Sequence, residues 1–108
     1  MTKVEQAIED LVSVVKQTKE YTEYRYQLEK LKMQPELHRQ VDNFRQENFE
    51  LQNLTPEDQL LQKTEQFEEK YQSFRENPLV TDFLEAELAF CRMMQEVNLK
   101  IMAELQFE

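Results

Sequence analysis

The sequence predicts an all-α protein, because glycine is absent, good helix formers dominate, and apolar residues recur with helical spacing. The 108 residues include no Gly and only 3 Pro. Without Gly, a turn that needs a positive φ must use Asn, Asp or a strained residue, which disfavours two-residue hairpins and a many-turned β fold. Glu, Gln, Lys, Leu and Met all favour helix. We therefore expect a single helical domain over residues 1–108, in which long antiparallel amphipathic helices form a small bundle that oligomerisation completes.

Two helix starts lie in the first quarter of the chain. Thr2 and Glu5 have the spacing of a capping box, in which each side chain satisfies a free backbone N–H. A helix from there to about Thr18 would carry a stripe with the 3.6-residue period, formed by Val4, Ala7, Ile8, Leu11, Val12 and Val15. Thr18 then offers a second cap, and the following stripe consists of Tyr21, Tyr24, Leu28 and Leu31.

Three prolines divide the rest of the chain. Pro35 disfavours helical backbone at Gln34 and removes a donor, so we expect the helix either to break or to bend there. Thr55 followed by Pro56 predicts a new helix with Thr as the N-cap and Pro as its first residue. Asn77 and Pro78 repeat that pattern and open the last helix.

The last helix is the candidate interaction element. If it is helical to about Leu105, it is ~40 Å long, and its apolar residues occupy more than one stripe. A domain of this size cannot bury all of them internally, so we expect a dimer or a higher oligomer. The residues predicted to form the interface are Phe83, Leu84, Glu87, Phe90, Met94, Val97, Ile101 and Leu105.

Charge and composition restrict the partners. The net charge is −9, with −2 in residues 1–54 and −7 in residues 55–108. Binding to nucleic acid or to an anionic membrane is disfavoured, because that affinity comes from Lys and Arg contacts to phosphate. The sequence shows no signal peptide and no stretch of ~20 apolar residues, and a single cysteine suits a reducing compartment. We expect a cytoplasmic protein.

The sequence offers little catalytic or metal-binding machinery. His38 is the only histidine and is expected to be exposed, while Cys91, the only cysteine, is expected to be a small buried hydrophobic residue. A zinc site needs several convergent ligands, and a phosphate-binding loop needs glycines. We therefore predict no metal, no cofactor and no enzymatic activity.

Two alternatives remain open. The first is a small enzyme that uses the carboxylates of Glu85 and Glu87, with Asp82 nearby. Glu87 lies between Phe83 and Phe90 on the apolar seam, so it should need a cationic partner. Arg92 lies five residues away, outside the favourable spacing of three or four, so we expect the partner to be a basic residue near Pro35. The second is a nucleic-acid accessory that uses a basic elbow, formed by Arg25, Lys30, Lys32, His38 and Arg39. The same elbow also allows a head-to-tail contact with the acidic half of a second copy of the chain.

The pattern resembles the YlbF/YmcA family of bacterial regulators. The residues that carry the resemblance are the opening amphipathic helix, the segments 18–21 and 44–45, Tyr24, Pro35, Met94, the segment 97–98 and above all residues 77–87, which read NPLVTDFLEAE. The resemblance implies long antiparallel helices, self-association and no enzymatic activity. It also implies family paralogues or an RNase Y-linked complex as partners, and a role in RNA processing or developmental signalling in Gram-positive bacteria.

The chain departs from the family pattern at two points. The family usually has Asp or Asn before the middle proline, whereas this chain has Gln34, which caps poorly, so a bend at this point is an alternative to a new helix. Some relatives carry carboxy-terminal cysteines linked to an iron–sulfur cluster. This sequence ends at Phe107 and Glu108 without them, so we do not expect the cluster here.

Overall fold

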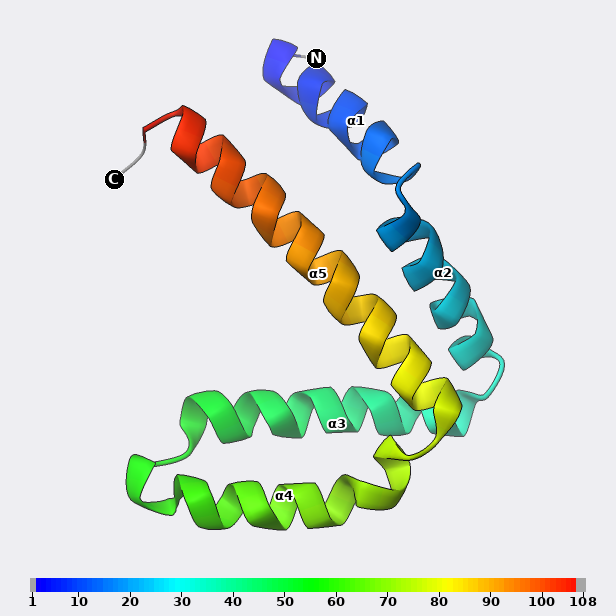
Figure 1. The fold of residues 1–108 in the computed structure, drawn as a ribbon, viewed down its shortest axis with the longest axis vertical. Coiled ribbons are helices and arrows are strands. Elements are labelled where there is room, and N and C mark those ends of the chain that lie inside the picture. Colours follow the sequence, from blue (N-terminus) through cyan, green and yellow to red (C-terminus); the bar gives the residue numbers. More distant parts are fainter. Residues whose placement is uncertain (1, 107–108) are drawn as a thin grey trace. The chain divides into compact units, whose positions relative to one another are not determined.

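The computed structural model describes residues 2–106, and this part of the chain is helical without strands (Figure 1). The helices are α1 (Lys3–Val15), α2 (Lys19–Lys32), α3 (Pro35–Leu54), α4 (Leu60–Arg75) and α5 (Pro78–Glu104), with a 3-10 turn at Glu57–Gln59. The all-α prediction is confirmed. Within the described residues the one positive φ outside glycine is 53° at Gln106, so the turns between helices use ordinary negative φ values.

Three of the predicted helix caps are present. The hydroxyl of Thr2 accepts a hydrogen bond from the Glu5 backbone N–H at 3.0 Å, and the hydroxyl of Thr18 accepts one from Tyr21 at 3.2 Å. At the start of α5, the Asn77 side-chain oxygen accepts the backbone N–H of Leu79 at 3.0 Å. Each cap satisfies one of the free donors that open a helix.

The middle prolines act differently from one another. At Pro35 the chain breaks and restarts: Gln34 has φ −125° and ψ 83°, makes no side-chain cap, and α3 begins at Pro35. Thr55 is not the N-cap that the sequence predicted. It lies in extended conformation after α3, its hydroxyl donates back to the Glu50 carbonyl at 3.4 Å, and a 3-10 turn separates it from α4. The fourth helix therefore begins at Leu60, four residues later than Pro56.

The chain forms two compact units, which we describe separately. One comprises residues 1–28 and 83–108, and the other comprises residues 29–82. Our prediction of a single domain over 1–108 stays a prediction.

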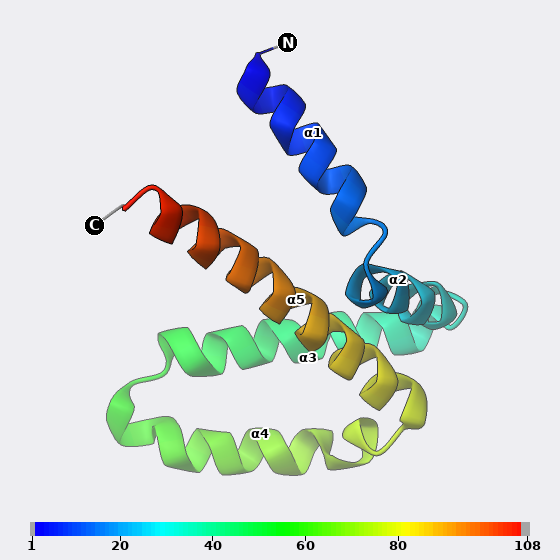
Figure 2. The same ribbon diagram turned by 45° about the horizontal axis from the view of Figure 1, so that its top comes forward.

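The first unit is held together by aromatic contacts between α2 and the first half of α5. Tyr24 lies 5.9 Å from Phe83 and 5.3 Å from Phe90 between ring centroids, and Tyr21 lies 5.7 Å from Phe90. Phe83 is fully buried. In both ribbon views α2 lies beside this part of α5, whereas α1 diverges from the second half of α5 (Figure 2).

The second unit is built around the α3–α4 hairpin. Phe44 on α3 is the centre of an aromatic cluster, with ring centroids 5.3 Å from Phe67, 5.1 Å from Tyr71 and 5.5 Å from Phe74. Packing of four aromatic rings gives this hairpin a large apolar contact for its size. The hairpin thus has a core of its own.

Candidate functional site

The α1 helix has an apolar stripe that is largely exposed. None of its residues, Lys3–Val15, is buried. Val4 is 70% exposed and Ile8 53%, and the stripe continues with Leu11 and Val12 on the same face. These positions follow the helical period, so the apolar side chains form one continuous surface. A contiguous exposed apolar surface of this kind is typical of a protein-interaction site.

The seam of α5 becomes more exposed along its length. Phe83 is fully buried, Phe90 and Val97 are half-buried, and Ile101 is 45% exposed. The reason is that α2 lies along only the first half of the seam, whereas α1 stands apart from the second half (Figures 1 and 2). The predicted interface residues therefore divide: Phe83 belongs to the core, Leu84, Glu87, Phe90 and Val97 are half-buried, and Met94, Ile101 and Leu105 are exposed.

Cys91 is exposed, so our prediction of a buried cysteine was wrong. The residue lies one position after Phe90, and one residue corresponds to ~100° of helix rotation. That rotation moves its side chain from the covered seam to a second face of α5. Leu88 and Met102, at 50% and 38% exposure, lie on this same face.

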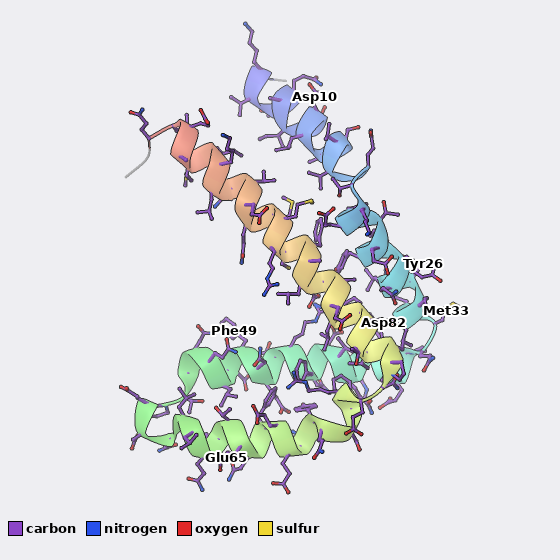
Figure 3. The ribbon with its side chains drawn as sticks, in the orientation of Figure 1. Asp10, Tyr26, Met33, Phe49, Glu65 and Asp82 are labelled. Atoms are coloured by element: carbon purple, nitrogen blue, oxygen red, sulfur yellow. The ribbon has the colours of Figure 1, made fainter. Side chains whose placement is uncertain are left out.

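The carboxylates of the enzyme alternative lie on different sides of α5. Glu85 and Asp82 are exposed and Glu87 is half-buried. Figure 3 labels Asp82 near the start of α5. A general acid–base pair needs a substrate position within hydrogen-bond reach of both groups. Asp82 and Glu85 are open to solvent, and Glu87 is turned by ~200° from Glu85, so these carboxylates do not converge on an enclosed position of that kind.

The basic elbow carries acidic neighbours at most of its positions. Lys32 lies 3.8 Å from Glu29, and the half-exposed His38 lies 3.9 Å from Asp42. Arg39 is paired with Glu36, whose hydrogen bond raises the pKa of the arginine. Arg25 is half-buried rather than exposed. Opposite charges this close weaken the positive field that phosphate binding requires.

Sequence reasoning missed a polar network that joins α3 to α4. Lys70 donates to Glu47 at 2.7 Å, and this hydrogen bond lowers the pKa of Glu47 and raises that of Lys70. Burial, followed by the hydrogen bond with Glu47, raises the pKa of Tyr71. The network lines an open hollow on the hairpin surface, together with Leu37 and Phe74. No motif could have revealed it, because residues 47 and 70 meet only once the hairpin forms.

The described residues form neither a metal-binding cluster nor a helix that could span a membrane. Across residues 2–106, no three His, Cys, Asp or Glu side chains converge in a way that could hold a metal ion. None of the helices in that range is both long enough and apolar enough to cross a membrane.

Comparison with known proteins gives one match. A family model described as control of competence regulator ComK, YlbF/YmcA, matches residues 4–106. A search of curated proteins and a search of solved structures each gave no match. The family match spans α1 to α5. It therefore includes both the α1 stripe (Val4, Ile8, Leu11 and Val12) and the open end of the α5 seam (Met94, Ile101 and Leu105). The chain belongs to the YlbF/YmcA family of regulators linked to control of the competence regulator ComK.

Proposed function

We propose that the chain is a non-enzymatic regulator that acts through helix-mediated protein–protein interaction, in homo- and hetero-oligomers. Its interaction surface consists of the α1 stripe and the open end of the α5 seam. The observation that carries the proposal is that α1 is amphipathic although none of its residues is buried. The cellular role that we assign to it is to modulate RNA processing or developmental signalling within a multiprotein complex.

The energetics of α1 support a partner. An isolated helix of fewer than ~12–15 residues is marginal in water, and α1 has 13 residues. Most helix stability in proteins comes from packing of an amphipathic face. Fully burying one Val, Leu or Ile side chain contributes about 1.5–3 kcal/mol. Covering the four stripe residues, which are 38% to 70% exposed, would therefore supply several kcal/mol toward association.

The alternatives have less support. The basic elbow is largely ion-paired, and the carboxylates of the enzyme alternative lie on different sides of α5, with Glu85 exposed and Glu87 half-buried. The family description concerns regulation of competence. These observations favour a binding protein over an enzyme or a nucleic-acid accessory.

The test places a charge on the stripe and the same charge on the opposite face of α1. Ile8→Asp changes the stripe, and Ser13→Asp is the matched control on the polar face. In a host strain that lacks the native gene, Ile8→Asp should fail to restore transformation frequency and to retain co-purifying proteins. Ser13→Asp should restore both. Equal behaviour of the two variants, at equal cellular abundance, would contradict the proposal.

A further inference from the structure

The second face of α5 has the spacing of a coiled-coil seam. Its positions are separated by alternating steps of four and three residues, which is the heptad pattern of two paired helices. We call these residues the outer stripe: Leu84, Leu88, Cys91, Gln95, Asn98 and Met102. Every member except Leu88 comes one position after an apolar residue of the α5 seam, as Cys91 comes after Phe90. The outer stripe is therefore turned by ~100° from that seam.

The outer stripe lies open along its length. Leu88 is 50% exposed and Met102 38%, Cys91, Gln95 and Asn98 are exposed, and Leu84 is half-buried. It contains no charged residue from one end to the other. In heptad terms Leu88, Gln95 and Met102 occupy the a positions, while Leu84, Cys91 and Asn98 occupy the d positions. A solvated helix face would be expected to carry charges here.

The charges that flank the stripe identify its occupant. Glu87 falls at a g position and Arg92 at the e position five residues later. Residues at g and e form salt bridges between helices and set partner choice and orientation. In a parallel pair of identical helices, Glu87 of each copy lies opposite Arg92 of the other. An antiparallel pair on the same stripe would instead place Arg92 against Arg92. The charges thus complement a second copy in parallel orientation.

We infer that a second copy of this chain covers the outer stripe, in a parallel α5–α5 pair that brings the two Cys91 side chains opposite each other. The inference rests on the proposed function, that the chain forms oligomers through its helices, and it adds a face on α5 beside the two surfaces named there. Glu87 can join the contact without losing other partners, because a carboxylate offers about four lone-pair sites. Gln95 and Asn98 within the stripe fix its register at some cost in stability, as polar a and d residues do. The pair should therefore dissociate on dilution.

Disulfide cross-linking tests the inference directly, because Cys91 is the single cysteine. Mild oxidation of the native chain should give a covalent dimer through Cys91. In a Cys91→Ser background, Leu84→Cys and Asn98→Cys should each cross-link to itself. Ala89→Cys, exposed on another face of the same helix, is the matched control and should react several times more slowly. Cross-linking of Cys91 no faster than this control would overturn the inference. Coupling of Leu84→Cys to Met102→Cys in a mixture, without self-coupling of Leu84→Cys, would overturn the parallel orientation.

A charge exchange gives an independent readout. Glu87→Lys sets Lys against Arg in the pair, and Arg92→Glu sets Glu against Glu, so each variant alone should lose Cys91 cross-linking. An equimolar mixture restores two opposite-charge contacts and should regain cross-linking as a mixed dimer, which mass spectrometry identifies. Circular dichroism of each variant verifies that it is folded. A mixture that cross-links no better than the separate variants would overturn the inference.

Failure of the inference can be told apart from failure of the proposed function. If the native chain is larger than a monomer and Ile8→Asp disrupts it, while Cys91 reacts no faster than the control, the outer stripe has another role and the proposed function stands. If the chain is a monomer and captures no protein partner, the proposed function fails and the inference falls with it.

Discussion

Phe44→Ala should be among the most destabilising single changes in the α3–α4 hairpin. The ring is 9% exposed and lies within 5.5 Å, centroid to centroid, of Phe67, Tyr71 and Phe74. Truncating a buried Phe to Ala typically costs about 3–5 kcal/mol, because the apolar contact is lost and a cavity is left. With about 4–8 °C of thermal midpoint per kcal/mol for a domain near this size, the midpoint should fall by roughly 12–40 °C. Urea unfolding followed by circular dichroism gives the free energy.

Phe49→Ala is the matched control on the same helix. Phe49 is 57% exposed and lies on the side of α3 away from α4 (Figure 3), so its loss should cost under about 1 kcal/mol. If Phe44→Ala is unfolded at room temperature, Phe44→Leu should still show a loss of about 1–2 kcal/mol. Equal losses for Phe44→Ala and Phe49→Ala would refute the assignment of the aromatic cluster as the core of this hairpin.

Three further changes test other parts of the structure. Asn77→Ala removes the cap on the Leu79 N–H and should cost about 0.5–2 kcal/mol in urea unfolding, whereas no loss would show that the cap is dispensable. Cys91→Ser should change stability by less than about 0.5 kcal/mol in dilute protein, because the side chain is exposed, and the native thiol should react readily with a disulfide reagent. Glu47→Gln should abolish the pH-dependent contribution of the Glu47–Lys70 ion pair to the free energy of unfolding. The lowered pKa of Glu47 makes the ion pair stabilising above the ordinary carboxyl pKa of 4.5, with loss as pH falls through the lowered value. Because the pKa of Lys70 is raised, the ion pair is fully stabilising below pH 10.5, and its contribution is lost as pH rises through the raised pKa. The difference in thermal midpoint between the native chain and Glu47→Gln should therefore be steady near neutral pH and disappear in acid, and a difference independent of pH would contradict this.

The sequence predicts helices well where a local signal decides the outcome. Thr2, Thr18 and Asn77 cap their helices because a side-chain oxygen two or three residues before a free N–H needs no tertiary partner. Thr55 failed as an N-cap because α3 runs to Leu54 and Thr55 is the C-cap that follows it, in extended conformation. The choice between ending one helix and starting the next depends on the length of α3 against α4, which no local motif specifies.

The candidate surface was predictable in outline only. Periodicity identified α5 as apolar over more than one stripe, but it could not say which stripe α2 would cover. For that reason Cys91 was assigned to the core, whereas one residue of rotation places it outside. Gln27 shows the converse case, since a polar side chain with no apolar signature is 6% exposed and donates to Glu23 at 2.9 Å. Burial of such a residue is decided by packing between segments distant in sequence.

The measurement that most directly tests helix-mediated association is the molar mass of the intact chain in solution. Light scattering coupled to size-exclusion chromatography, over a range of micromolar concentrations, reports that mass without a label. We expect a mass at least twice that of the 13.2 kDa chain, with a fall toward the monomer on dilution, and a lower mass for Ile8→Asp than for Ser13→Asp because the contacts of the α1 stripe are lost. A constant mass of 13.2 kDa for the native chain at every concentration would contradict self-association through these helices.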